Sequence, residues 1–110
     1  MNKLDALAAL SALGQDTRLE VFRLLVRAGQ DGLSAGDIAE RLGVFQNTLS
    51  THLKILTSAR LIAAKRHGRV ILYSADMTGF GDLLGYLMED CCAGSPALCQ
   101  PVIDAVTCQS

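Results

Sequence analysis

The sequence predicts a mainly α-helical domain that carries one small β-hairpin. Four segments before residue 60 repeat apolar residues at helical spacing, and glycines lie between these segments. Two short segments rich in β-branched residues follow, on either side of His67-Gly68-Arg69. The 110 residues are the length of one domain, which is enough to bury a modest core.

The first two predicted helices meet at Gly14. A short apolar stripe precedes this glycine and consists of Leu4, Leu7 and Ala8. Asp16 and Thr17 are start signals for the second helix, which Gly29 ends. Its buried face, with spacing i, i+3, i+4 and i+7, is predicted to be Val21, Leu24, Leu25 and Ala28.

The third and fourth predicted helices form a helix-turn-helix. Ser34 is the predicted N-cap of the third helix, Asp37 stands three residues on as in a capping box, and Gly43 ends the helix. A fourth helix is predicted from about Gln46 to Ser58, with its inward side formed by Leu49, Leu53 and Leu56. Two helices joined by such a short turn make this motif.

A hairpin and a last helix complete the predicted domain. Residues 61–66 and 70–74 are the predicted strands, and the cationic hairpin between the helices is the wing of a winged helix-turn-helix. A further helical stripe begins after Asp76 and consists of Phe80, Leu83, Leu84 and Leu87. This stripe is too apolar for a free surface helix, so it needs the domain core or another subunit. We expect a DNA-binding and dimerisation domain at 1–92 and a cysteine-bearing tail, weakly periodic, at 93–110.

Hydropathy and composition restrict the protein class. No apolar run approaches the roughly 18 residues that cross a bilayer, and the first ten residues lack the pattern of a secretory signal. We therefore predict a cytoplasmic protein with no membrane partner. Thiols stay reduced in that compartment, so clustered cysteines indicate metal binding or redox sensing more than a structural disulfide framework.

Charge is distributed unevenly, although the net charge is only −1. Residues 1–40 have a net charge of −2, residues 41–69 have +6 with no acidic residue, and residues 70–110 have −5 with no Lys or Arg. A cationic middle third that coincides with a helix-turn-helix indicates a nucleic-acid surface.

Over roughly residues 4–92, the sequence resembles the ArsR/SmtB family of dimeric metalloid- and metal-responsive repressors. The matching residues are Asp16-Thr17-Arg18-Leu19, Gln46, Thr48, Ser50, His52-Leu53-Lys54, Leu56, Ala59-Arg60-Leu61-Ile62, Arg66, Gly68-Arg69 and Tyr73. The resemblance implies a homodimer built from the first and last helices. It also implies that two recognition helices enter successive major grooves of double-stranded operator DNA.

The sequence departs from several patterns of that family. One group of its arsenic sensors carries cysteines at the start of the recognition helix, where this chain has Gly43-Val44-Phe45-Gln46. Phe45 replaces the usual hydroxyl N-cap, and Asn47 stands where many members have proline. Zinc and nickel sensors use His and Asp on the last helix, but this chain has no His after His67. The chain is similar to a further branch, in which a C-terminal cysteine pair and one more cysteine bind arsenite.

All four cysteines lie in the last twenty residues. The resemblance implies that Cys91, Cys92 and Cys99 bind arsenite, As(III), with antimonite as an alternative effector and Cys108 as a further candidate ligand. Three thiolates suit these ions because soft ions select sulfur over oxygen and nitrogen. The same thiols leave cadmium, lead or zinc open, although the spaced cysteine pairs typical of structural zinc sites are absent. No organic cofactor is predicted.

Two other roles are open to these cysteines. A redox switch would form a disulfide or persulfide among them, but Glu89 and Asp90 precede the pair, and acidic neighbours disfavour thiolate formation. A thiol enzyme such as an arsenate reductase needs backbone amides or an arginine beside its nucleophile, and no Lys or Arg follows Arg69. The sequence therefore predicts that the protein is not an enzyme.

The DNA contacts are predicted on the fourth helix and the wing. Phosphate neutralisation is expected from Lys54, Arg60, Lys65, Arg66 and Arg69. Base contacts are expected from the outward residues near the helix start, which are Gln46, Asn47, Ser50 and Thr51. The resemblance adds Thr48 and His52, although a His within an apolar pattern is also typical of a packed residue. The sequence thus predicts a repressor that leaves its operator when trivalent arsenic binds.

Overall fold

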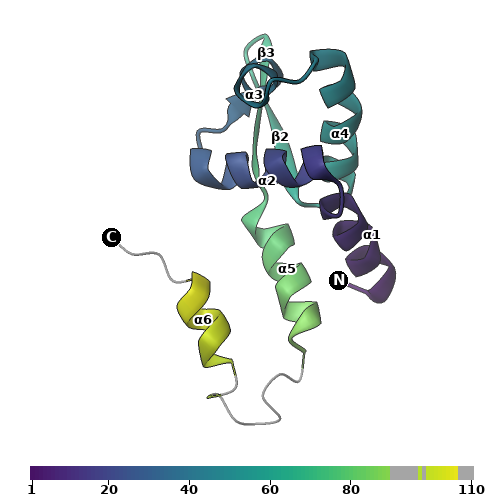
Figure 1. Ribbon diagram of the computed structural model, residues 1–110, viewed down its shortest axis with the longest axis vertical. Coiled ribbons are helices and arrows are strands. Elements are labelled where there is room, and N and C mark those ends of the chain that lie inside the picture. Colours follow the sequence, from purple (N-terminus) through teal and green to yellow (C-terminus); the bar gives the residue numbers. More distant parts are fainter. Residues whose placement is uncertain (90–96, 98, 107–110) are drawn as a thin grey trace.

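Six helices and a small sheet make up the part of the chain that the computed structural model describes, which is residues 1–89, 97 and 99–106 (Figure 1). In chain order the elements are α1 Lys3–Leu13, α2 Asp16–Ala28, β1 Leu33–Ser34, α3 Ala35–Leu42, α4 Gln46–Ser58, β2 Ile62–His67, β3 Val70–Ala75, α5 Met77–Leu87 and α6 Gln100–Val106. The helices α3 and α4 form the predicted helix-turn-helix, and β2 and β3 form the predicted wing. None of the described helices has the length and apolar character needed to span a membrane.

The five helices α1 through α5 share one apolar core. Its largest fully buried side chains are Val21, Leu25, Ile38, Leu49, Leu56, Leu61, Ile62 and Leu83. The predicted inward leucines of α4 are all buried, and so are Val21, Leu24 and Leu25 of α2. Burying each such side chain contributes about 1.5–3 kcal/mol, so this core fixes how α4 is rotated about its axis.

The helix ends follow the capping signals in the sequence. Ser34 Oγ accepts a hydrogen bond from the backbone N–H of Asp37 at 3.1 Å. Gly43 ends α3 in the left-handed conformation, at φ 67°, as predicted for the turn between α3 and α4. The structure adds a reciprocal capping box at the start of α1, between Asn2 and Asp5, that was not predicted from the sequence.

The sheet has three antiparallel strands in the order β1-β3-β2, where the sequence predicted a two-stranded hairpin. The added strand, β1, pairs Leu33 with Tyr73 and Ser34 with Leu72. A strand of two residues is too short to show an alternating pattern, so periodicity cannot reveal it. Its pairing holds the start of α3 against the wing.

The last two helices differ in how much of their surface is covered. In α5, Gly79 and Leu83 are buried, whereas Leu84 and Leu87 are exposed. The helix α6 forms where the sequence has only weak periodicity, and none of its residues is buried. Residues 90–96, 98 and 107–110 lie outside the described part, and with them the predicted ligands Cys91 and Cys92 and the candidate Cys108.

Candidate functional site

The exposed side of α4 carries most of the predicted DNA-contacting residues. The exposed members are Gln46, Asn47, Thr48, Ser50, Thr51 and Lys54. Figure 1 shows that the start of α4 and the tip of the β2–β3 hairpin lie at the same end of the molecule. The residue types at the helix start have the donors and acceptors that contact base edges in a major groove.

His52 is held by a residue that was not predicted to contact it. The guanidinium Nη1 of Arg18 lies 3.2 Å from His52 Nδ1, and Arg18 Nε donates to the backbone oxygen of Ala12 at 2.7 Å. Since arginine can only donate, this contact makes Nδ1 the acceptor and leaves the ring proton on Nε2. His52 is half-buried, so it is both packed by Arg18 and partly open to solvent. The signal for Arg18 in the sequence was only its place in the Asp16-Thr17-Arg18-Leu19 match.

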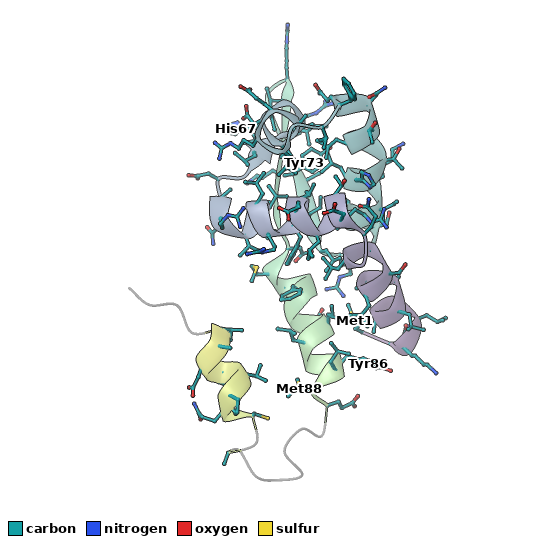
Figure 2. All side chains as sticks on the ribbon, viewed as in Figure 1. Met1, His67, Tyr73, Tyr86 and Met88 are labelled. Carbon is teal, nitrogen blue, oxygen red and sulfur yellow. The ribbon has the colours of Figure 1, made fainter. Side chains whose placement is uncertain are left out.

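The basic residues of the wing lie on different faces of the hairpin. Lys65 pairs with Leu72 and Arg66 pairs with Ile71, and neighbouring residues of a strand point to opposite faces. Lys65 therefore shares the face of His67, and these two residues, together with Arg66, line a cavity of about 550 Å³. Arg66 shares the face of Tyr73, which lines a second cavity together with residues of α4. In Figure 2, His67 lies toward the tip and Tyr73 lies deeper between the elements.

Arg60 sits at the opposite end of α4 from the helix start. It has a positive φ of 62°, the one such non-glycine residue in the described part of the chain. Its Nη2 donates to Asp82 Oδ2 of α5 at 2.6 Å, and both side chains are about half exposed. Gly79 of α5 approaches the Arg60 backbone so closely that an added Cβ would lie well under 3.0 Å from it. Arg60 is therefore part of the junction between α4 and α5.

This placement predicts different effects for two arginines that were both predicted to contact phosphates. Arg69→Gln is expected to reduce the dependence of operator affinity on salt by about one released ion per protomer, since Arg69 is exposed at the wing tip. Arg60→Gln is expected to leave that dependence nearly unchanged, because Asp82 already pairs with Arg60. Titrations of a labelled operator at several salt concentrations measure both slopes. Equal reductions would mean that Arg60 leaves Asp82 to contact a phosphate.

Large apolar side chains remain exposed on two helices that lie against each other. They are Leu4, Leu7 and Leu10 of α1 and Met77, Leu84 and Leu87 of α5. In α1, Ala6, Ala9 and Ala12 face the core instead of the leucines. Met1 and Tyr86 line one small cavity beside α5, and Figure 2 shows them side by side. We call the exposed leucines of these two helices the α1–α5 surface.

The predicted thiol site falls mostly outside the described residues. Cys99 is described and is disulfide-bonded. Within residues 1–89, 97 and 99–106, no group of three or more His, Cys, Asp or Glu side chains comes together in a way that would hold a metal ion. The α5 helix ends at Leu87, four residues before Cys91, so this helix connects the thiol segment directly to the α4–α5 junction.

Comparisons with known proteins support a regulatory role. A family model described as a helix-turn-helix domain matches residues 13–63. The transcriptional repressor SdpR of Bacillus subtilis is 35% identical over 78 residues, which are 71% of this chain and 83% of SdpR. The ArsR2 protein of Halobacterium salinarum, whose name assigns it to an arsenical resistance operon, is 37% identical over 62 residues. This second match covers 56% of this chain but only 51% of ArsR2.

Solved structures show the same arrangement of elements. NolR from Sinorhizobium fredii has a TM-score of 0.62 and 30% identity, over 77% of this chain and 82% of NolR. HlyU from Vibrio cholerae has a TM-score of 0.60 and 27% identity, over 79% of this chain and 97% of HlyU. An ArsR-like transcriptional regulator from Rhodococcus, at 24% identity, shows the likeness of fold with a TM-score of 0.68 over 94% and 90% of the two chains.

Proposed function

This chain belongs to the ArsR/SmtB family of winged helix-turn-helix transcriptional regulators, and we propose that it is a repressor released from operator DNA by trivalent arsenic. The observation that carries the proposal is the junction of α4 with α5. One side of this junction leads to the DNA-contacting helix, and the other leads along α5, whose last residue, Leu87, lies four residues before Cys91. A ligand that repositions the end of α5 therefore acts on the helix that also holds α4 in position.

Backbone contacts make the junction stiff. The backbone N–H of Leu61 donates to Leu56 of α4 at 3.1 Å, and the backbone N–H of Asp76 donates to Leu61 at 2.9 Å. Asp76 is the N-cap of α5, and its carboxylate accepts from the N–H of Gly79 at 2.8 Å. Because α4, Leu61 and the start of α5 are linked in this way, a shift of α5 is transmitted to α4 rather than absorbed in a loop.

Dimerisation completes the proposed DNA-binding unit. The α1–α5 surface exposes large apolar side chains, including Leu4 at 77% and Leu87 at 50%, and such surfaces are typical of subunit contacts. A related domain from Mycobacterium bovis is described as homodimeric. Two chains joined through α1 and α5 present two α4 helices, so a change in this contact alters the spacing between them. Recognition helices must match half-sites about one helical turn apart, so altered spacing lowers affinity.

The proposed ligand set is Cys91, Cys92 and Cys99, with arsenite or antimonite as the effector. Arsenous acid and three thiols give one arsenic trithiolate and three water molecules, so each thiol loses its proton and no electron is transferred. Cys99 is disulfide-bonded, so its sulfur can bind a thiophilic ion only after reduction. Sulfur ligands also explain selectivity for soft ions.

Arsenite is expected to weaken operator binding by the reduced dimer about 5–150-fold, the range of typical allosteric coupling. The measurement is operator affinity by fluorescence anisotropy, with protein kept in a thiol-free reductant and titrated with arsenite. Thiolate-to-arsenic absorption is recorded in the same samples, because linkage requires both signals to change together. Equal operator affinity with and without arsenite, despite stoichiometric arsenic binding, would contradict the proposal.

Oxidative release is a second candidate, favoured by the disulfide of Cys99. HlyU of Vibrio cholerae, which is 27% identical to this chain, has also been solved in a form described as reduced. In this mechanism two thiols lose two protons and two electrons to an oxidant, and the resulting disulfide repositions α5. A peroxide or polysulfide would then release DNA, whereas arsenite under reducing conditions would leave operator affinity unchanged. The two mechanisms are thus separated by which reagent lowers the affinity.

A further inference from the structure

We propose that Phe45 is a specificity-determining residue that packs against the C5-methyl group of a thymine in each half-site of the operator. The inference rests on the proposed DNA-binding function and assigns it one more contact. Phe45 is the N-cap of α4, and its side chain is 81% exposed, the highest value among the large apolar side chains of the described residues.

Helix stability does not explain a phenylalanine at this position. The N-caps of α1, α2, α3 and α5 are Asn2, Gln15, Ser34 and Asp76, and each accepts a backbone hydrogen bond through its side chain. Phe45 accepts none, so α4 lacks the side-chain cap that these four helices have. An apolar N-cap is among the least favourable choices for a helix start. The residue therefore lowers local stability and at the same time exposes an aromatic ring.

Packing within the protomer does not explain Phe45 either. Neighbouring Leu42 and Val44 pack against the core, but Phe45 is not among the residues that do so. Single exposed apolar residues are common and need no special explanation on a neutral surface. Here, however, the ring lies at the start of the recognition helix, and its neighbours Gln46 and Asn47 are polar and exposed.

The position of Phe45 favours DNA as the molecule that contacts its ring. Residues 41–69 carry six basic side chains and no acidic one, so this surface complements a polyanion. The start of α4 is the part of such a helix that reaches base edges. Among groups in the major groove, the thymine methyl is the apolar one, and phenylalanine is one of the side chains that contact it. Asn47 Oδ1 accepts a hydrogen bond from the backbone N–H of Thr48 at 2.9 Å, and Phe45 stands immediately before Gln46, the first residue of α4.

The first experiment selects operators from a random duplex library with the wild-type dimer and with Phe45→Ser. Wild-type selection is expected to enrich thymine at one position of each half-site, and selection with Phe45→Ser is expected to lose this enrichment. The serine also restores a hydroxyl N-cap, so the variant remains folded and its melting temperature should not fall. Phe45→Leu is the matched control, because leucine keeps an apolar contact and should keep the enrichment.

The second experiment replaces the enriched thymine by deoxyuridine, which removes only the methyl group. Each replacement is expected to weaken wild-type binding about fourfold, as for one buried methyl group, and both together about fifteenfold. Binding by Phe45→Ser should not respond to either replacement. The inference is overturned if wild type and Phe45→Ser show the same thymine dependence, or if neither shows any. Arsenite release of wild-type protein in the same assay reports on the proposed function separately, because release with no thymine dependence leaves that function standing.

Discussion

Replacing Cys91, Cys92 or Cys99 by serine is expected to abolish the response of operator binding to arsenite while leaving operator affinity without arsenite within about twofold of wild type. Serine offers a hard oxygen in place of a soft sulfur, so each change removes one bond that trivalent arsenic needs. The arsenite-induced change in operator affinity, about 5–150-fold, should therefore vanish, because arsenic that is not bound cannot influence DNA binding. Operator titrations of each reduced variant at saturating arsenite measure this loss.

Cys108→Ser is the matched control for these three variants. It makes the same chemical change in the same tail, and we expect it to respond to arsenite as wild type does. If Cys108→Ser also loses the response, the ligand set includes Cys108. If Cys91→Ser, Cys92→Ser and Cys99→Ser all retain it, the C-terminal thiol site is not the sensor. If arsenite leaves operator binding by the reduced wild-type protein unchanged but peroxide weakens it, and the cysteine variants lose that peroxide response, the oxidative mechanism is favoured.

Gly79→Ala is expected to lower the free energy of unfolding by about 3 kcal/mol, the upper part of the range for inserting an atom into a packed region. The added Cβ would overlap the backbone oxygen of Arg60, and a backbone atom has no rotamer that could move it aside. The start of α5 must then separate from the end of α4, which should also weaken operator binding. Urea unfolding at fixed protein concentration measures the first effect, since dimer stability depends on concentration.

Gly81→Ala provides the contrast within the same helix. Within the described part of the chain, a Cβ at Gly81 would point into open space, so alanine should stabilise α5 by about 0.5–1 kcal/mol through its higher helix propensity. Opposite signs for the two alanines would support a close junction between α4 and α5. Equal effects would show that Gly79 is not tightly packed against Arg60 in solution.

Much of this fold is determined by local sequence patterns. The apolar spacing in α2 and α4 predicted their buried faces, because a helix returns to the same side every three to four residues. Ser34 and Gly43 predicted the bounds of α3, because capping is decided by neighbouring residues. The cationic segment from Arg41 to Arg69 indicates a nucleic-acid surface by composition alone.

Other features depend on contacts between distant parts of the chain, which no local period encodes. The sequence could not show that Arg60 pairs with Asp82, that Arg18 holds His52, or that β1 joins the sheet. Periodicity also could not decide which side of α1 faces the core, because leucines and alanines both recur at helical spacing. In the structure the alanines are buried and the leucines are exposed.

The sequence by itself determined the winged helix-turn-helix class, its capped helices, the cationic segment and the clustering of cysteines, because each is a local pattern or a composition. Only the tertiary structure decided which arginine meets α5, which leucines of α1 and α5 stay uncovered, and that the ring of Phe45 is exposed at the start of α4. The physical reason is that burial and pairing depend on where the whole backbone brings distant residues together, and a residue's neighbours in sequence do not specify that.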